Sequence, residues 1–395
     1  MSRRVLLVAV LVGCRVAPPP SPQPLCSEPG CAWHSLAHLV DSAVADSAAP
    51  GAVVAVSARG RRFFHGSGRL GNGDATLPDS TTLYDLASLT KVVALTTGLM
   101  LAEQQGRLRL DDPVARYVQA FRGPGKERVT VRHLLTHSSG LPAHRPLWRQ
   151  SPDWQAALAL VDSTSLDSLP GTRTLYSDLG AIVLTQILEA VTGEPLDRWL
   201  TRRVFEPLGM RATRFLPPAE AGVRIAPTEL DPWRGRVLQG EVHDENAWWL
   251  GGVSGHAGLF SNAADLLTFG EWLLQGLAPS RRGAGPLRPP GRLARWTAPQ
   301  GVVPGASRAL GWDTPSPGGS AGSRMSPRSF GHTGFTGTSI WIDPARELVV
   351  ILLSNRVHPT RDNPRLGRLR PLVADCATAL SDGISCVFDR GGWGF

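Results

Sequence analysis

The sequence predicts an α/β protein of the α+β kind, in which flanking helices cover one antiparallel sheet formed from both ends of the chain. Two strand-like runs, "GAVVAVSA" and "RRFFHG", lie near the start around an Arg-Gly turn. Two more, "TSIWID" and "ELVVILLSN", lie near the end around a Pro-Ala-Arg turn. Between them, most periodic segments repeat apolar residues at helical spacing. A mostly helical region at about 107–290 is therefore inserted between the segments that form the sheet.

The individual helices are predicted from apolar periodicity and from residues that favour helix ends. A first helix at 36–44 is followed by the breakers Pro50 and Gly51. Thr130 is expected to cap a helix at its N-terminus, and Gly193 is expected to end another. The segment "RALGWDT" is expected to add a strand before the C-terminal hairpin. The remaining helices are expected at 92–105, 131–136, 154–161, 179–191, 196–205, 264–274 and 372–380.

The N-terminus predicts export. Arg3 and Arg4 precede an apolar run at 5–12, which is too short to span a membrane and is typical of a signal peptide. The run ends in "LVGC", which resembles the bacterial lipobox, so Cys14 is expected to carry lipid and to anchor the protein to a membrane from the periplasmic or cell-surface side. An ordinary cleaved signal that happens to contain Cys14 is the alternative. The expected organisation is a signal at 1–14, a Pro-rich tether at 15–32 and one folded domain at 33–390.

The remaining four cysteines are expected to form disulfides, because an even set outside the cytosol is typical of them. The pairs could be local, or they could join the two ends of the chain. Zinc ligation is the weaker alternative, since neither pair has C-x-x-C spacing. These four residues are Cys26, Cys31, Cys376 and Cys386.

The charge of +8 does not predict a nucleic-acid partner. The arginines are dispersed, no block of five or six basic residues occurs, and aromatic residues are not interleaved with them.

Only two of the 41 Lys and Arg residues are lysines, Lys91 and Lys126. A chain that nearly always uses arginine keeps a lysine three residues after Ser88.

That spacing places the Lys91 amine beside the Ser88 hydroxyl at the start of a helix. A serine needs a proton acceptor to become a nucleophile, and a desolvated lysine can be neutral near pH 7 while an arginine stays charged. The backbone N–H groups of the first helical turn also favour developing negative charge. Taken alone, the pair could equally be an N-cap and a solvated lysine.

Two further motifs follow in order. "LPGTRTLYSD" places Tyr176 in a loop just before a helix, and "SFGHTGFTG" places His332 and Thr333 at a strand entrance. With "SLTK", these stretches resemble the serine β-lactamase and penicillin-binding-protein superfamily, near class C β-lactamases, D-alanyl-D-alanine carboxypeptidases and their esterase relatives. "VRHLLTHSSGLP" and "GHAGLFSNAADLLTFGEWLL" are also similar to recurrent blocks of that family. The resemblance covers about 50–355 and implies a β-lactamase/transpeptidase-like fold.

The resemblance implies a role for each motif residue. Ser88 would be acylated, Lys91 would share in accepting its proton, and Tyr176 would relay a proton to the leaving group, with a phenol pKa lowered by nearby cations. Which residue is the acylation base is disputed across this superfamily, so the role falls to the pair. On the strand, His332 and Thr333 would bind the substrate, and Thr333 would contact its carboxylate. Gly334 would keep the strand edge open for the substrate. The backbone N–H groups of Ser88 and Phe335 would form the oxyanion hole.

Two positions depart from the family pattern. Asp178 stands where asparagine is usual, and a carboxylate cannot donate a hydrogen bond to a substrate amide oxygen. It could instead pair with Lys91, raise the pKa of that lysine and weaken it as a base. His332 in place of lysine resembles carboxypeptidases and esterases more than potent class C β-lactamases. Both departures argue against efficient β-lactam hydrolysis.

The sequence therefore predicts an exported serine hydrolase that acts through an acyl-serine on esters or on D-Ala-D-Ala-type cell-wall peptides. A catalytically weak penicillin-binding or sensor protein, or a β-lactamase, is the alternative. No cofactor or metal is expected, and the oligomeric state is not predicted. The polar segment from His243 to Asn246 is expected to form a buried, hydrogen-bonded loop beside the cleft; a metal site is the alternative, although the spacing fits no zinc pattern. His133 and His137 are expected to pack or anchor loops.

Overall fold

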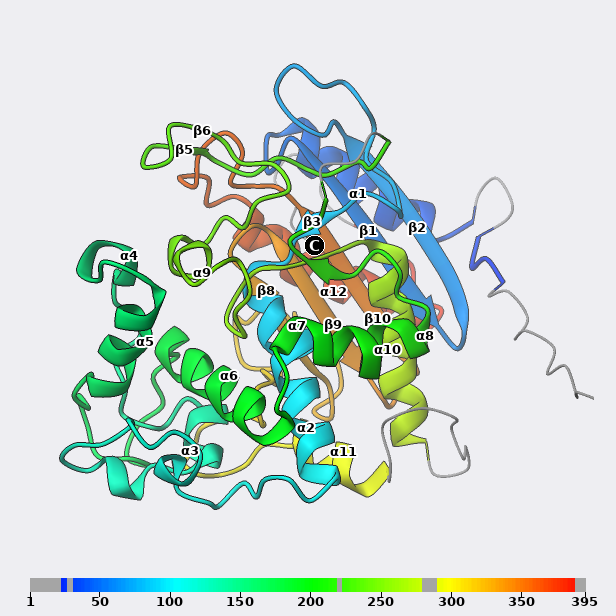
Figure 1. Cartoon of the computed structure of the whole chain (residues 1–395). Helices are drawn as coiled ribbons and strands as arrows, with labels where there is room; N and C mark the ends of the chain where they lie inside the picture. Colours follow the sequence, from blue (N-terminus) through cyan, green and yellow to red (C-terminus); the bar gives the residue numbers. More distant parts are fainter. Residues whose placement is uncertain (1–22, 27–30, 219–221, 279–289, 388–395) are drawn as a thin grey trace, which may run out of the picture.

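A five-stranded antiparallel sheet joins the two ends of the chain, in the order β2-β1-β10-β9-β8 (Figure 1). The computed structural model describes residues 23–26, 31–218, 222–278 and 290–387. Strand β1 pairs with β10 from Ala52 opposite Ser354 to Ala58 opposite Leu348, so the N-terminal and C-terminal hairpins meet at the middle of the sheet. The prediction of one sheet built from both ends is confirmed. The strands are β1 (Gly51–Ala58), β2 (Arg61–Gly68), β8 (Phe330–Gly334), β9 (Thr338–Asp343) and β10 (Leu348–Ser354).

The sheet has a hydrophobic core on each face, which explains why β1 reads as an unbroken apolar run. Val53 and Ala55 belong to the larger core, whereas Val54 and Val56 belong to the smaller one. Helices α1 (His34–Ala45) and α12 (Leu366–Ser381) pack together over the face of the smaller core. Helix α10 (Ala263–Leu277) packs on the other face, against β1 and β10.

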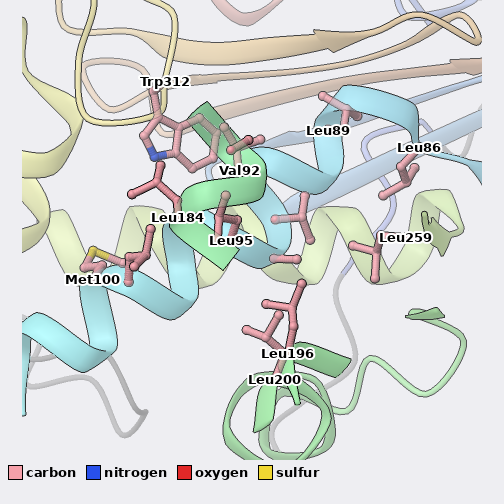
Figure 2. Close-up of a cluster of buried hydrophobic side chains, with 14 of the residues drawn as sticks. Leu86, Leu89, Val92, Leu95, Met100, Leu184, Leu196, Leu200, Leu259 and Trp312 are labelled. Carbon is pink, nitrogen blue, oxygen red and sulfur yellow. The ribbon is translucent and has the colours of Figure 1, made fainter. Parts of the chain in front are cut away.

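The larger core surrounds a helix that starts at Lys91 and is buried over nearly its whole length. It runs as a π-helical segment, η2 (Lys91–Thr96), into α2 (Thr97–Gln104), and a single 3₁₀ turn, η1 (Ala87–Leu89), precedes it. Figure 2 shows its apolar side chains packed against other helices and against Trp312. Burial on all sides fixes the position of its N-terminus, where the "SLTK" motif lies.

The inserted region is helical, as predicted. Thr130 caps α3 through the backbone N–H of His133, and α6 ends at Gly193 in the left-handed conformation. No single helix in the described residues is long and apolar enough to cross a membrane. By length and composition only, α6 and the segment Leu196–Leu208 could do so together, but they meet at a bend of 66°. The helices are α3 (Val131–Leu135), α4 (Leu147–Gln150), α5 (Trp154–Ser163), α6 (Asp178–Thr192), α7 (Leu196–Leu200), α8 (Glu206–Leu208), α9 (Glu245–Trp249) and α11 (Pro290–Thr297), with short turns η3 (Val114–Arg116), η4 (Lys126–Arg128) and η5 (Thr201–Phe205).

Two small sheets complete the fold. One has the order β3-β7-β4 and leads directly into the turn that carries Ser88. The other is a two-stranded ribbon, β5-β6, above α9 (Figure 1). Their strands are β3 (Tyr84–Asp85), β4 (Arg214–Phe215), β5 (Leu230–Asp231), β6 (Arg236–Val237) and β7 (Leu259–Ser261).

Two predictions about this architecture need correction. The segment "RALGWDT" is not a strand: it turns at Gly311, where φ is +78°, and contributes an isolated bridge between Asp313 and Gly331. Part of the predicted tether is docked, because the Leu25 N–H donates to the Arg62 carbonyl of β2 at 2.7 Å. A Pro-rich composition does not prevent pairing with an exposed strand edge.

The four cysteines form the local pairs, Cys26–Cys31 and Cys376–Cys386. This result selects one of the arrangements that the sequence left open and leaves these thiols unavailable as zinc ligands. The predicted signal peptide and Cys14 lie outside the described residues.

Candidate active site

Ser88 lies in the turn between β3 and the buried helix, as the sequence predicted. The preceding Ala87 has φ +46°, which is uncommon for a residue with a side chain. A left-handed residue at this point makes the chain leave β3 sharply, so that Ser88 stands at the N-terminal end of the helical segments η1 and η2. A positive φ at a residue with a side chain strains the backbone, so contacts with the surrounding structure must stabilise this turn.

The Lys91 ammonium has three partners, which match its three N–H donors. Its Nζ lies 3.1 Å from Ser88 Oγ, 2.9 Å from the carbonyl oxygen of His256, and 2.7 Å from Asp178 Oδ1. Burial alone lowers the pKa of Lys91, but the Asp178 carboxylate and Tyr176 raise it above its ordinary value. Lys91 is therefore protonated at neutral pH. The expectation of a neutral amine is wrong for the resting site, and the anticipated pairing with Asp178 is confirmed.

Tyr176 faces this pair from the loop before α6. Lys91 Nζ lies 4.9 Å from the centre of its ring. The phenol oxygen is shielded from solvent and lies near Lys91 and Ser88, but among the described residues none is placed to form a well-aligned hydrogen bond with it. Burial raises the pKa of Tyr176 and outweighs the opposing effect of Lys91, so the predicted lowering of the phenol pKa is wrong. A buried hydroxyl without a partner is uncommon, and it leaves a donor available to a substrate.

Hydrogen bonds donated by backbone N–H groups hold the loop of Tyr176 and Asp178 in place. Ser177 caps α6 by accepting a hydrogen bond from the Gly180 N–H at 3.2 Å, and the Asp178 N–H donates to the Ala143 carbonyl at 2.9 Å. His137 Nδ1 accepts from the Ser177 N–H at 3.1 Å. The expectation that His137 anchors a loop is therefore confirmed.

His332 lies on β8, the edge strand of the large sheet, and it is not a cation. Burial lowers its pKa to about 4, so the imidazole is neutral at pH 7. Nδ1 donates to the Thr333 carbonyl at 2.8 Å, because a carbonyl oxygen can only accept. Nε2 is buried, and no described residue bonds to it. Lysine at this position would place a positive charge on β8 that the neutral imidazole does not supply.

The turn after β8 is attached to the Ser88 turn. Thr336 Oγ1 donates to the Asp85 carbonyl at 2.7 Å, and Thr338 Oγ1 donates to the Leu86 carbonyl at 3.0 Å. Gly334 lies so close that a Cβ there would stand 2.3 Å from the Leu86 carbonyl oxygen. Phe335, which follows, is about half exposed. These bonds hold the turn that contains Phe335 against the segment that leads into Ser88.

Arg308 is a further residue of the site that the sequence did not reveal. Its guanidinium carbon lies 5.5 Å from the centre of the Tyr176 ring, and it forms an ion pair with Asp313. It belongs to the segment that was expected to be a strand. Nothing in the local sequence marks it, because its position depends on the path of an irregular loop.

Fold and site together agree with one class of protein, the hydrolases of the serine acyl-enzyme type. The model of the family described as "Beta-lactamase" matches residues 36–375. The chain belongs to this family.

Individual relatives are similar over most of the chain. A protein of Escherichia coli (strain K12) named "Putative D-alanyl-D-alanine carboxypeptidase" is 34% identical over 316 residues, which cover 72% of this chain and 71% of the relative. The solved structure of a hydrolase with promiscuous acyltransferase activity, EstCE1, has a TM-score of 0.70 at 23% identity and covers 88% of this chain and 98% of its own. The octameric penicillin-binding protein homologue from Pyrococcus abyssi has a TM-score of 0.71 at 22% identity, over 89% and 78%. These two structures support the fold.

Proposed function

We propose that the protein is a serine hydrolase that cleaves D-Ala-D-Ala-type cell-wall peptides through an acyl-serine at Ser88. The observation that carries the proposal is the contact of Ser88 Oγ with Lys91 Nζ, beside a buried Tyr176 whose hydroxyl has no well-aligned partner. An activated serine with a free proton donor beside it has the two groups that acyl transfer needs.

In the first step, Ser88 Oγ attacks the substrate carbonyl and loses its proton. Lys91 is already charged, so it can take this proton only by giving one of its own to Asp178, whose Oδ1 is 2.7 Å away. The net transfer is then from Ser88 to Asp178 through Lys91. Tyr176 donates its phenol proton to the leaving amine as the carbon–nitrogen bond breaks, and water later hydrolyses the ester by the reverse sequence.

The negative charge on the carbonyl oxygen would be stabilised by the backbone N–H groups of Ser88 and Phe335. The edge of β8 would pair with an extended substrate, as exposed strand edges do. Thr333 and the Arg308 guanidinium would bind the terminal carboxylate of a D-Ala-D-Ala peptide. The name of the E. coli relative agrees with this substrate class.

A second candidate is an esterase. The neutral His332 favours it, because a site without a lysine at this position attracts a free carboxylate less strongly. The pairing of Arg308 with Asp313 has the same effect, since the guanidinium is already neutralised.

A substrate panel distinguishes the two. Hydrolysis of diacetyl-Lys-D-Ala-D-Ala, p-nitrophenyl butyrate and a chromogenic cephalosporin should be measured with the wild type and with Ser88→Ala. The proposal expects release of D-alanine at a higher kcat/KM than cephalosporin turnover, and no turnover by Ser88→Ala. Ester hydrolysis without D-alanine release would establish the esterase. Undiminished activity of Ser88→Ala would contradict both.

We also propose that the protein is exported and anchored through lipid on Cys14, on the strength of the sequence of its first 14 residues. Cells grown with radiolabelled palmitate should label the wild type but not Cys14→Ser. A wild type that carries no label, or a variant that carries as much, would contradict the anchor.

A further inference from the structure

A buried carboxylate links the Ser88 turn to the polar segment that begins at His243. Asp85, the last residue of β3, is 2% exposed. Its Oδ1 accepts the Ala87 N–H at 2.8 Å, and its Oδ2 accepts the His243 N–H at 2.7 Å. No lysine or arginine in the described part of the chain forms an ion pair with it. A carboxylate buried without a cation is unfavourable, so its two bonds to backbone must matter to the structure.

The first of these bonds holds a strained residue. Ala87 has φ +46°, and a left-handed conformation costs about 1–2 kcal/mol for a residue with a Cβ. The Ala87 N–H bond to Asp85 opposes relaxation of this turn. The direction of the next peptide N–H, that of Ser88, depends on the same turn.

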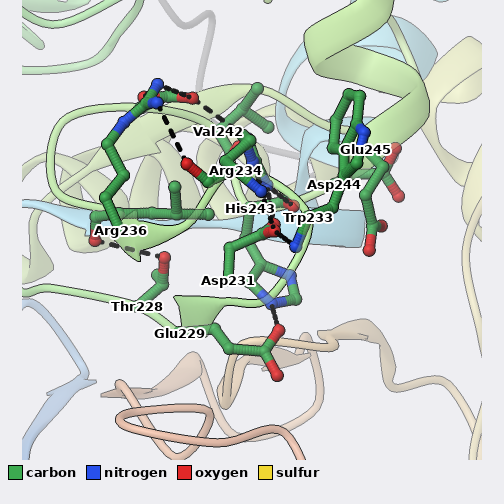
Figure 3. A network of polar contacts seen from close by, with 12 residues as sticks. Thr228, Glu229, Asp231, Trp233, Arg234, Arg236, Val242, His243, Asp244 and Glu245 are labelled. Carbon is green, nitrogen blue, oxygen red and sulfur yellow. Dashed lines mark hydrogen bonds and ion pairs between the residues drawn. The ribbon is translucent and has the colours of Figure 1, made fainter. Parts of the chain in front are cut away.

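The second bond leads to the other side of the oxyanion hole. The His243 ring stacks on the Phe335 ring, with centres 5.8 Å apart and planes 24° apart. His243 Nε2 donates to Glu229 Oε2 at 2.8 Å, and Arg234 donates to the His243 carbonyl at 2.7 Å. Figure 3 shows this histidine between Glu229 and the ion pair of Asp231 with Arg234. Its backbone and its ring are therefore fixed on three sides.

We infer that Asp85 and His243 are positioning residues that set the distance between the two backbone donors of the oxyanion hole. The inference rests on the proposed function. The donors belong to different elements: the Ser88 N–H follows β3, and the Phe335 N–H follows β8. The Asp85–His243 link touches both elements, through Ala87 on one side and the Phe335 ring on the other. Neither residue contacts the reacting atoms.

The test uses two variants of the link and one control. Asp85→Asn keeps the shape but replaces one acceptor oxygen by an NH₂ group that cannot accept a backbone N–H. His243→Gln keeps a donor for Glu229 but removes the stacked ring. Asp111→Asn is the control, because its carboxylate pairs with Arg132, which contacts neither Asp85 nor His243.

Two readouts separate positioning from a loss of folded protein. One is the kcat and KM for p-nitrophenyl butyrate, and the other is the Kd of phenylboronic acid, whose tetrahedral adduct on serine places an oxygen in the oxyanion hole. Removing one oxyanion donor lowers kcat by about 10²–10³-fold, so misplacing one should lower it by about 10–100-fold. We expect Asp85→Asn and His243→Gln to lower kcat and to weaken boronate binding by similar factors, with KM within about threefold. His243→Phe, which restores a ring, should recover part of the loss.

Several results would overturn the inference. It fails if both variants keep the kcat and boronate Kd of the wild type, or if Asp111→Asn loses as much as they do. It also fails if KM rises while kcat is retained. Should Asp85→Asn not fold, as judged by circular dichroism and melting temperature, the two His243 variants decide the question. A wild type that neither hydrolyses the ester nor binds the boronate overturns the proposed function, and the inference with it.

Discussion

Replacing Asp178 by asparagine tests the proton balance of the site. In the wild type, the carboxylate lies 2.7 Å from Lys91 Nζ and keeps the ammonium protonated. Asparagine has nearly the same shape but no charge. Lys91 would keep its contacts with Ser88 Oγ and the His256 carbonyl, so the perturbation is mainly electrostatic.

The expected effect follows from the charges and their burial. Two unit charges about 4 Å apart at an effective dielectric constant of about 20 attract by about 4 kcal/mol. The Lys91 side chain is 4% exposed and the Asp178 side chain is 23% exposed, so solvent screens part of this attraction. We therefore expect Asp178→Asn to remove about 1.5–3 kcal/mol of attraction between the two side chains, which corresponds to about 1–2 pKa units at 1.36 kcal/mol per unit. The pKa of Lys91 should fall, because its charged form loses its counter-ion.

The assay is the pH profile of kcat/KM for p-nitrophenyl butyrate, whose acidic limb reports the deprotonation of the essential base in the free enzyme. In the proposed mechanism the proton of Ser88 passes through Lys91 to Asp178. Without that carboxylate the acceptor can only be a Lys91 that has already lost its own proton, so in Asp178→Asn the acidic limb should move to higher pH, toward the pKa of Lys91. Asp111→Asn is the control, because it removes a carboxylate that pairs with Arg132 and is 74% exposed. An acidic limb that stays in place, or that moves to lower pH, would refute the reasoning about Lys91 and Asp178.

Three further predictions concern the edge strand and its neighbours. Because the pKa of His332 is about 4 in the folded protein and about 6.5 when unfolded, the unfolded chain binds more protons between these pH values, and stability falls as the pH falls through them. Between pH 7 and pH 4, the free energy of unfolding measured by urea denaturation should therefore fall by about 3 kcal/mol less in His332→Gln than in the wild type. Equal decreases in the two proteins would contradict the assigned burial effect. Gly334→Ala should lower kcat at least tenfold and reduce the melting temperature, because the new Cβ would stand 2.3 Å from the Leu86 carbonyl oxygen. Gly367→Ala is the control and should change neither, because a Cβ there would have no atom within 4 Å. Arg308→Gln should raise KM for the D-Ala-D-Ala peptide about tenfold and leave KM for the butyrate ester unchanged; equal changes for both substrates would remove Arg308 from carboxylate binding.

Much of the fold could be predicted because its signals are local. The apolar runs of β1 and β10 are buried on both faces, and buried strands read as continuous hydrophobic segments. Thr130 and Gly193 mark helix ends through their own side chain or backbone conformation. The prediction of a strand in "RALGWDT" was wrong because its apolar residues, Leu310 and Trp312, belong to a turn that is buried in the core.

The members of the site were predictable, and so was the pairing of Lys91 with Asp178 that raises the pKa of the lysine. Ser88, Lys91 and Tyr176 stand in motifs whose order carries the resemblance, and the structure brings them together. The raised pKa of Tyr176 was not predicted, because it depends on burial, which a motif does not show. Arg308 and Asp85 were not singled out from the sequence, because their roles depend on contacts between segments that are far apart in the chain.

The central claim is that Ser88 becomes covalently acylated. Intact-protein mass spectrometry after incubation with benzylpenicillin, and separately with a fluorophosphonate, tests it most directly. We predict one adduct per wild-type chain with at least one of the two reagents, located by peptide mapping on the peptide that contains Ser88, and no adduct on Ser88→Ala. A wild type that stays unmodified by both reagents, or a Ser88→Ala variant that is modified equally, would contradict the account.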